Sequence, residues 1–344
     1  MNQPAQLILT VDYEVFGDGS GQPRPCVLES TERILAIAES RGVPLTLFVE
    51  ALEFAAMERE PACQAQSDAV RLQLTEALAR GHDLQLHLHP QWWDAKLDPA
   101  GNWQLDLSRW RIGDLPFHEV AGLLEQGKVW LEGLGRQQRP DYRCIAFRAG
   151  GWCIQPSALV LAALSDQGFL IDSTVAPGLR NATAGEWSDF RDAPDLPFWN
   201  VDQNLTVPVS HGVWEFPILT GRVARLDHLK ALRKAGLAEG CQGSYRGPRG
   251  AAARLYGRLS RLRQLGAVML DFSTLPAPQL IEITRQWCER FAGEPASLPL
   301  AAIGHSKNFT ATSERALTEY LDWVNGQGIV GTTYPDALES ISGS

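Results

Sequence analysis

The chain has 344 residues, of which 44% are hydrophobic and 21% are charged, and its formal net charge is −9. This composition is ordinary for a soluble globular protein. The acidic balance argues against nucleic-acid binding by the protein as a whole, since such binders are usually basic. No run approaches the roughly 18 apolar residues of a membrane span. The first residues, MNQPAQLILTVDYE, lack a basic leader, so we expect a cytoplasmic protein.

The six cysteines form no C-x-x-C pair. In a cytoplasmic chain of this size we expect them to be reduced packing residues rather than parts of a disulfide or a thiolate zinc site.

Strand-like and helix-like segments alternate almost throughout the chain. Apolar runs predict strands at 7–12, 43–49, 83–89, 143–148, 169–172, 213–219, 267–272, 298–304 and 328–333. Helical patterns lie between them at 28–42, 67–81, 117–134, 156–167, 278–291 and 313–328. We expect Ser67 to cap the second helix, and Gly42 and Gly81 to end the first two.

This alternation implies βαβ units and a parallel sheet. We expect one α/β domain over residues 1–344, a barrel of parallel strands with loop and helical insertions at about 91–116 and 176–265. A doubly wound open sheet is the alternative, but the sequence holds no glycine-rich phosphate loop to support a nucleotide-binding version of it.

Residues 222–263 depart from the acidic balance, with eleven Lys or Arg residues against Asp227 and Glu239. Residues 251–266 are typical of a helix that has leucines on one face and arginines on the other. A solvated outer helix explains this segment. The alternative is a docking surface for an anionic membrane or a phosphate-bearing glycan carrier.

Seven ionisable residues lie at or just past the carboxyl ends of the predicted strands: Asp12, Glu14, His87, His89, Arg148, Asp172 and His305. In a parallel barrel all these ends open on one face, where the chemistry of such barrels is built. We therefore expect residues that are spread over nearly 300 positions to converge on one pocket.

His87 and His89 are two residues apart, so an extended strand places both imidazoles on one face, with Cβ atoms about 7 Å apart. This favours a zinc-type ion, for which Asp12 or Glu14 would supply a third ligand. The histidines could instead be packing residues or a pH-sensitive patch. His82, at the opposite end of the strand, is interpreted as structural, with a ligand role as the alternative.

Arg148 would hold a catalytic carboxylate ionised and oriented, unless it forms a purely structural ion pair. Gly150 and Gly151 leave backbone amides free to approach an oxyanion, although a tight turn explains them equally well. Asp172 is expected to support Arg148 or a histidine, and His305 suits a general acid.

The tryptophans that follow the two histidines offer a possible sugar contact. Trp92 and Trp93 could present flat apolar faces to a sugar ring or could fill the core.

On these segments the chain resembles the polysaccharide deacetylase family (carbohydrate esterase family 4). LTVDYE is similar to the family's TFDDG motif, and PLTLFVE to the A-T-F-F-V strand that follows it. GHDLQLHLHP resembles GHE-x-x-x-H, and FRAGGW resembles F-R-x-P-Y. DST and GHSK resemble the last two motifs, so the resemblance covers roughly residues 7–310.

The resemblance implies a distorted seven-stranded (β/α) barrel and a divalent metal ion, zinc in the first place. It implies that Asp12 is the catalytic base held by Arg148, that Gly151 supplies the oxyanion amide and that His305 is the general acid. Trp152, in the FRAGGW segment, joins Trp92 and Trp93 as an expected substrate contact.

Two departures from the family pattern affect the metal ligands. Tyr13 replaces the metal-binding Asp, so that either Glu14 or Asp12 is the carboxylate ligand. Gln91 occupies the place of the second histidine, and His89 is the nearest substitute. We therefore expect Glu14, His87 and His89 to bind the metal.

The pattern is similar to the branch associated with lipopolysaccharide and surface-glycan biosynthesis. We expect a hydrolase that removes an N-acetyl or O-acetyl group from a saccharide or glycan precursor. The alternatives are a hydrolase of non-sugar amides on the same scaffold and a catalytically silent glycan-binding homologue.

Overall fold

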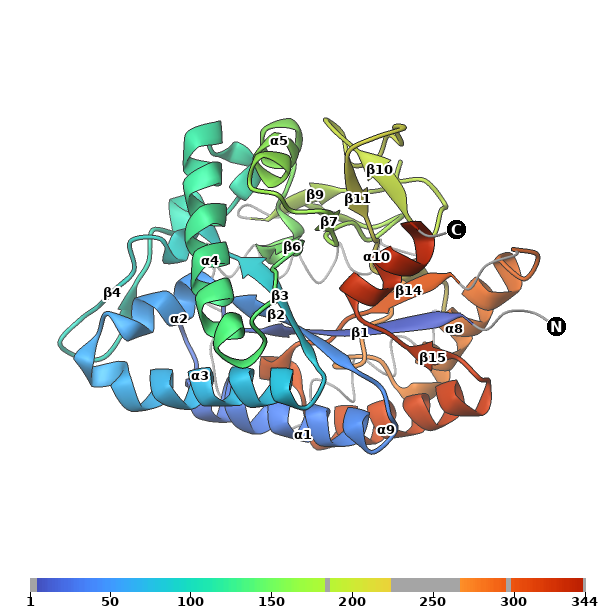
Figure 1. Ribbon diagram of the computed structural model, residues 1–344, viewed down its shortest axis with the longest axis horizontal. Coiled ribbons are helices and arrows are strands. Elements are labelled where there is room, and N and C mark those ends of the chain that lie inside the picture. Colours follow the sequence, from blue (N-terminus) through green and yellow to red (C-terminus); the bar gives the residue numbers. More distant parts are fainter. Residues whose placement is uncertain (1–4, 183–185, 224–266, 295–297, 343–344) are drawn as a thin grey trace.

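The computed structural model describes residues 5–182, 186–223, 267–294 and 298–342 (Figure 1). A curled sheet of nine strands runs through these ranges, in the order β10–β11–β7–β6–β3–β2–β1–β14, with β15 also paired to β1. Every pair in it is parallel except β10–β11. The expected α/β fold with a parallel sheet is confirmed.

The sheet curls far enough for its two sides to meet. Ile218, just beyond β11, forms a parallel bridge with Ala301 of β14, and the backbone N–H of Leu219 donates to the carbonyl of Ala301 at 2.9 Å. The backbone N–H of Ile218 also donates to Val175, beyond β7. The result is a distorted barrel that closes through an irregular segment rather than through a regular ladder.

The strands of the sheet are β1 (Gln6–Tyr13), β2 (Leu45–Glu50), β3 (Asp83–Leu88), β6 (Ala146–Ala149), β7 (Ile171–Asp172), β10 (Trp199–Val201), β11 (Val213–Glu215), β14 (Pro299–Ala302) and β15 (Val330–Gly331). The helices around it are α1 (Glu29–Glu39), α2 (Ala51–Glu58), α3 (Gln64–Ala79), α4 (Phe117–Gln138), α5 (Ala158–Asp166), α8 (Ala277–Arg290), α9 (Ala311–Gly326) and α10 (Tyr334–Ser342). Figure 1 shows α1, α3 and α9 along one side of the barrel.

Alternation along the strands separates two environments. Leu7, Leu9 and Val11 of β1 point outward and join the large core under the helices, whereas Ile8 lies in a smaller cluster inside the barrel. Phe48 of β2 belongs to that inner cluster. Since side chains alternate with a period of two, the residues that continue these inward rows point into the barrel.

Two local predictions have opposite outcomes. Gly42 and Gly81 adopt φ angles of +65° and +91° just after α1 and α3, as expected for residues that end helices. The prediction that Ser67 caps a helix is wrong. A 3₁₀ turn at Pro61–Cys63 leads into α3, which begins at Gln64, so that Ser67 is buried inside the helix.

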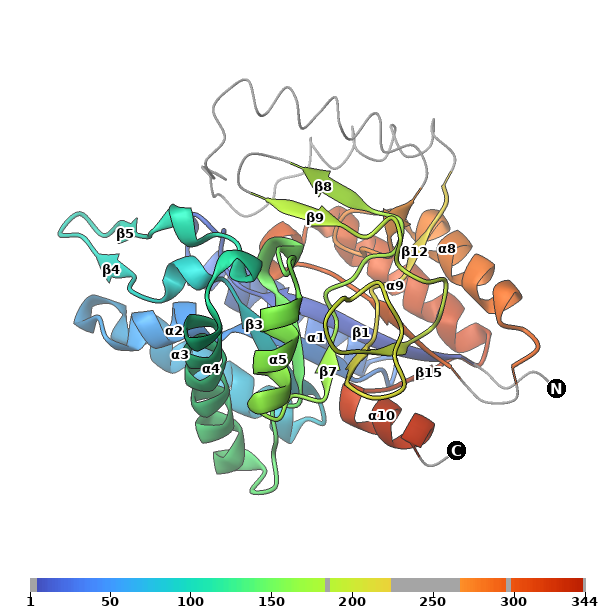
Figure 2. The same cartoon turned by 90° about the horizontal axis from the view of Figure 1, so that it is seen from above.

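The insertions carry short hairpins. β4 (Lys96–Leu97) pairs with β5 (Trp103–Gln104), and β8 (Arg180–Ala182) pairs with β9 (Trp187–Asp189). Figure 2 shows both hairpins at the periphery of the sheet. The run at 267–272, predicted as a strand, contributes β13 (Val268–Met269), which pairs with β12 (Thr220–Gly221) outside the main sheet. Farther along the run, Asp271 forms a parallel bridge with Ile303, just beyond β14.

The basic segment at 222–263 lies outside the described residues from position 224 onward. Cys63, Cys144, Cys153 and Cys288 have free thiols, as expected, but Cys26 is disulfide-bonded, so the prediction of a reduced thiol is wrong there. Within the described ranges, none of the helices combines the length and apolar character that crossing a bilayer requires.

Candidate active site

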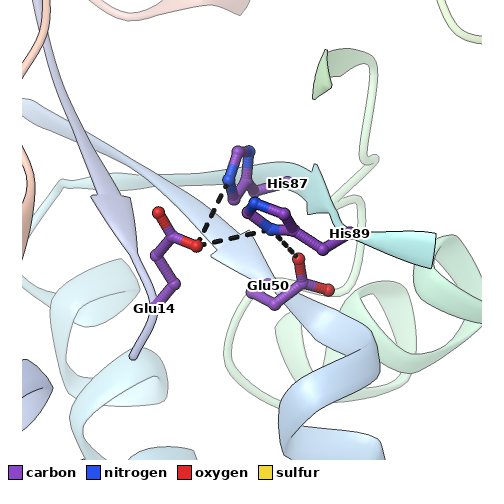
Figure 3. Close-up of side chains that lie close together, drawn as sticks. All are labelled: Glu14, Glu50, His87 and His89. Atoms are coloured by element: carbon purple, nitrogen blue, oxygen red, sulfur yellow. Dashed lines mark hydrogen bonds and ion pairs between the residues drawn. The ribbon is translucent and has the colours of Figure 1, made fainter. Parts of the chain in front are cut away.

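Three neighbouring strands deliver the polar side chains to one place. Asp12 and Glu14 continue the inward row of β1, Glu50 ends the inward row of β2, and His87 and His89 end that of β3. All five side chains are buried. Figure 3 shows the carboxylates of Glu14 and Glu50 facing the two imidazoles. The predicted convergence at the carboxyl ends of the strands is thus what the structure contains.

His87 presents a free ring nitrogen. Its Nδ1 lies 3.0 Å from the backbone carbonyl of Arg148. Because a carbonyl oxygen only accepts, Nδ1 carries a hydrogen, and in the neutral ring the lone pair is on Nε2. Nε2 is buried without a hydrogen-bond partner among the described residues and lies 3.6 Å from Oε2 of Glu14. Two acceptors that face each other in a buried site call for a proton or a cation between them.

His89 faces two carboxylates with one nitrogen. Its Nδ1 lies 2.8 Å from Oε2 of Glu50 and 3.4 Å from Oε2 of Glu14, and its ring stands edge-on to that of His87 with centroids 4.9 Å apart. Burial raises the pKa of Glu50 to about 7, against the lowering effect of His89. Glu50 can therefore hold or release a proton near neutral pH.

The donor set fits a divalent metal ion. One ligand atom from each of Glu14, Glu50, His87 and His89 lies within 4.8 Å of all the others. Two ligands at about 2.0–2.1 Å from a tetrahedral zinc ion are separated by about 3.3 Å. The separations of 3.4 and 3.6 Å between Oε2 of Glu14 and the two imidazoles are close to that value. Glu14, rather than Asp12, is the carboxylate between the histidines.

Glu50 did not figure among the expected site residues. The signal was present, because Glu50 is the last residue of the apolar run PLTLFVE and so obeys the same rule as the other site residues. It lies opposite His87 in the register of β2 and β3.

Lys307 neutralises the other oxygen of Glu14. Its ammonium group donates to Oε1 of Glu14 at 2.7 Å and to the carbonyl of Val15 at 3.1 Å, and it is buried. Burial raises the pKa of Glu14, but Lys307, His89 and His87 together outweigh it and hold that pKa well below its usual range. Glu14 is therefore a carboxylate at neutral pH.

Asp12 lies between Arg148 and His305. Its Oδ1 accepts a hydrogen bond of 2.6 Å from Nη1 of Arg148, and its Oδ2 lies 3.5 Å from Nε2 of His305. Burial raises the pKa of Asp12, yet Arg148, His87 and His305 lower it by more, so the net shift is downward. Asp12 is thus an ionised carboxylate with one oxygen committed to Arg148.

The guanidinium of Arg148 is fully buried and held on all sides. Nε donates to the carbonyl of Ser173 at 2.9 Å, Nη1 donates to Thr10 at 3.0 Å, and the group stacks 3.9 Å from the ring centre of Phe48. These contacts fix the direction from which Arg148 meets Asp12.

Asp172 makes no hydrogen bond to Arg148 or to a histidine within the described ranges, but its charge interacts with that of Arg148, in the indirect supporting place that was expected. Its Oδ1 accepts from the hydroxyl of Thr174 at 2.7 Å, and that hydroxyl in turn accepts from the backbone N–H of Ala149 at 3.0 Å. Asp172 also faces Glu215, and burial raises the pKa of both carboxyls. Through Thr174, Asp172 thus stabilises the end of β6 that carries Arg148, without itself contacting the histidines.

The turn after β6 is shaped by two consecutive residues with positive φ, Gly151 at +59° and Trp152 at +57°. A tryptophan rarely adopts this conformation, and such strain is found at functional sites. The turn places the Trp152 ring 6.0 Å from the ring of His305. Gly150 lies against His89, since a Cβ atom there would fall 2.4 Å from the imidazole.

The other two tryptophans expected to bind sugar lie elsewhere. Trp92 is only 1% exposed and packs edge-on against Trp103 with centroids 5.3 Å apart, so its expected role in substrate binding is wrong. Trp93 packs against α4, where a Cβ on Gly122 would lie 3.0 Å from its ring. Trp110, which the sequence did not single out, lies 6.0 Å from His89.

His82 lies at the amino end of β3, away from this cluster. Its Nδ1 accepts from the backbone N–H of Leu45 at 3.0 Å, and its Nε2 lies 2.9 Å from Glu39. These contacts join β3 to β2 and α1.

No protein-family profile and no curated protein matches the chain. Solved structures do match it. A probable polysaccharide deacetylase from Pseudomonas aeruginosa PAO1 aligns at 11% identity over 98% of this chain and 90% of its own, with a TM-score of 0.51. A 4-alpha-glucanotransferase from Thermococcus litoralis aligns at 13% over 98% of this chain but 40% of its own, with a TM-score of 0.51.

A putative polysaccharide deacetylase from Mycobacterium smegmatis aligns at 14% identity over 99% of this chain and 96% of its own, with a TM-score of 0.49. At these identities the likeness shows the fold. The protein shares its fold with the probable polysaccharide deacetylase from Pseudomonas aeruginosa PAO1 and with part of the glucanotransferase. Function must therefore be argued from the site.

Proposed function

We propose that the protein is a metal-dependent hydrolase that removes an N-acetyl or O-acetyl group from a saccharide or glycan precursor. The observation that carries the proposal is the buried, unpartnered Nε2 of His87, which shares Oε2 of Glu14 with His89. The Asp12–Arg148 pair and His305 lie directly beside this cluster. A metal centre next to an ionised carboxylate and an imidazole is a typical arrangement for hydrolysis by activated water.

Glu14, His87 and His89 would hold the ion, which we propose to be zinc, with Glu50 as a fourth ligand. When bound, such an ion polarises the acyl carbonyl and acidifies a water molecule. Glu50, with its pKa near 7, would take up or release a proton as the ion leaves or binds.

In this proposal Asp12 is the general base. Arg148 holds one oxygen of Asp12 and keeps the carboxylate ionised, so that Oδ2 is free to accept a proton from the attacking water. The backbone N–H of Gly151 would donate to the oxyanion of the tetrahedral intermediate, in a turn whose backbone carries no side chain at that position.

His305 is proposed as the general acid. Its Nε2 lies 3.5 Å from Oδ2 of Asp12, so acid and base flank the same reaction centre. His305 would give its proton to the leaving amine or alcohol of the sugar, and Trp152 beside it would contact the sugar ring.

One observation favours a second candidate, a catalytically silent glycan-binding protein. The ammonium group of Lys307 already occupies Oε1 of Glu14, so the carboxylate has a partner without any metal ion. A hydrolase of non-sugar amides, a role in surface-glycan assembly and contact of residues 222–263 with an anionic membrane remain predictions from the sequence.

Acetate release from N-acetylglucosamine oligomers, compared with the ring opening of small cyclic amides, tests the proposal. We expect release by the zinc-loaded protein and a loss of about 10²–10⁴-fold in the variant Asp12→Asn, which removes the base without removing a proposed ligand. Bound zinc with no acetate release in either protein would support the silent alternative.

A further inference from the structure

A cavity opens beside the segment that follows the Gly151 turn. It encloses about 550 Å³ and is lined by Arg111, Gln155, Pro156, Ser157, Ala158, Trp187, Gln203 and Asn204. A single sugar ring needs less space than this, and the flat face of an indole is suited to a sugar ring.

The cavity adjoins the turn that carries Gly151. A Cβ atom on Gly151 would lie 3.3 Å from Nε1 of Trp110 and 3.8 Å from Cγ of Glu186. The residues that follow these two neighbours, Arg111 and Trp187, line the cavity. On each of these two segments, one residue therefore lies beside the proposed oxyanion turn and the next residue lines the cavity.

The cavity is held in shape by close backbone packing. The backbone N–H of Gly113 donates to the carbonyl of Cys153 at 3.3 Å, and a Cβ atom on Gly113 would fall 2.5 Å from the carbonyl of Gln155. Both polar atoms of the Gln155 side chain are paired with the backbone of Asp189, on β9. The segments around Gly113, Gln155 and Asp189 thus contact one another and form the wall of the cavity.

Of the described residues that line this cavity, only Arg111 carries a charged side chain. Its guanidinium stacks over Trp187, 5.4 Å from the ring centre, and its Nη2 contacts Asp114 at 3.1 Å and the carbonyl of Gln155 at 3.2 Å. Its Nε is buried and has no hydrogen-bond partner among the described residues. The guanidinium thus keeps one donor, Nε, without an acceptor, and a cationic donor of this kind favours an anionic acceptor.

The charge of that acceptor follows from Asp114. Because Asp114 already places one negative charge on the same guanidinium, a singly charged carboxylate is better accommodated than a doubly charged phosphate. We propose that this cavity binds a uronic acid unit of the glycan, with its carboxylate on Arg111 and its ring against Trp187. The inference deepens the proposed function, because it names a neighbouring sugar of the acetylated substrate.

The test is a binding measurement that needs no turnover. Glucuronic acid and glucose are titrated into the full-length protein, and the indole resonances of ¹⁵N-labelled tryptophan are followed, with Trp187→Leu identifying the relevant signal. We expect glucuronic acid to shift the Trp187 resonance and to bind at least tenfold more tightly than glucose. Arg111→Gln should abolish this preference.

Arg109→Gln is the matched control. Arg109 lies in the same insertion and contacts Glu119 at 2.5 Å, but it does not line the cavity, so the preference should survive its substitution. Equal affinity for the two sugars, a preference that survives Arg111→Gln, or no binding of either sugar would overturn the inference. Since no acetate is measured, glucuronic acid binding without deacetylase activity would defeat the proposed function and leave this site standing.

Discussion

The ammonium group of Lys307 lies 2.7 Å from Oε1 of Glu14, and both side chains are buried at the end of β1. The other oxygen of the same carboxylate faces His87 and His89 at 3.6 and 3.4 Å. One carboxylate therefore contacts the ammonium group of Lys307 on one side and the candidate metal ligands on the other. Lys307 holds Glu14 ionised, which a metal ligand requires.

Replacing Lys307 by methionine tests whether the two oxygens of Glu14 serve Lys307 and a metal ion separately. The variant leaves a buried carboxylate without its partner, which costs about 3–5 kcal/mol of unfolding free energy in the metal-free protein. A bound ion would then be the remaining cation beside Glu14, so the rise in Tm on addition of zinc should be larger in Lys307→Met than in the wild type. Thermal unfolding in chelator and in zinc measures both effects.

Lys128→Met is the control for this experiment. Lys128 donates to the carbonyl of Gln167 at 2.6 Å and lies over Phe169, away from the site. Its loss should shift Tm equally with and without zinc. A zinc-induced rise in Lys307→Met no larger than that of the wild type would contradict the placement of the ion beside Glu14.

Gly150→Ala should weaken metal binding without touching a ligand. The new Cβ would lie 2.4 Å from the ring of His89, so the imidazole must move. We expect zinc affinity to fall about 10–100-fold, the range found when groups that orient ligands are altered. Titration of the metal-free protein with zinc measures this effect.

Gly133→Ala provides the matched comparison, because Gly133 lies in α4 with nothing within 4 Å of a Cβ atom. That variant should bind zinc as the wild type does and gain about 0.4–1 kcal/mol of stability. Equal zinc affinity in the two alanine variants would show that His89 is not a ligand.

Arg148→Lys should shift the pH dependence of acetate release. Asp12 acts as a base only when ionised, so activity falls as the pH drops through its pKa. Burial raises that pKa and Arg148 lowers it, and lysine cannot make the several contacts of the guanidinium. The acid limb of kcat/KM therefore moves to higher pH, and at neutral pH activity falls about 10²-fold because Asp12 is less well positioned.

Arg71→Lys, at an ion pair of 2.7 Å with Glu58, should leave the pH profile unchanged. An acid limb that stays in place in Arg148→Lys, despite reduced activity, would mean that Asp12 is not the base whose ionisation the profile reports.

Asp83, the first residue of β3, makes the free energy of unfolding depend on pH. Burial raises its pKa to about 7 in the folded protein, against about 3.9 in an unfolded chain. Between these values the folded state holds a proton that the unfolded state has released, so this contribution to stability falls as the pH rises from about 4 to about 7. Asp83→Asn should remove this loss of stability. Its free energy of unfolding should exceed that of the wild type by up to about 4 kcal/mol at pH 8, but by little near pH 4.

Urea unfolding of both proteins across this pH range measures the difference. Asp68→Asn, at an exposed position of α3, should change stability by less than about 0.5 kcal/mol. A constant difference between Asp83→Asn and wild type at every pH would refute the buried, protonated state of Asp83.

The strands at the centre of the fold were predictable because each is a buried apolar run that ends in a polar residue. The register of parallel strands then brings Asp12, His87 and Arg148 to one edge, as their positions in the sequence indicated. Glu50 obeys the same rule at the end of β2, so it could have been predicted. Lys307 could not, because its contact with Glu14 spans 293 positions and depends on the turn after β14.

Helix α2 and the burial of Trp92 could not be predicted from the sequence, for a different reason. Nearly every residue of α2 is buried, so its sequence ALEFAAME shows no polar face from which a helical period can be recognised. Trp92 is covered by Trp103 of the β4–β5 hairpin, whose two-residue strands are too short to show a period. Packing between insertions follows from the tertiary fold rather than from local pattern.

The most direct test of the proposed function is acetate release from N-acetylglucosamine oligomers, measured as zinc is added back to the metal-free protein. The proposed function predicts no release without zinc, a linear rise with bound zinc and saturation at one ion per chain. Full release from the metal-free protein, or one bound ion with no release, would contradict it.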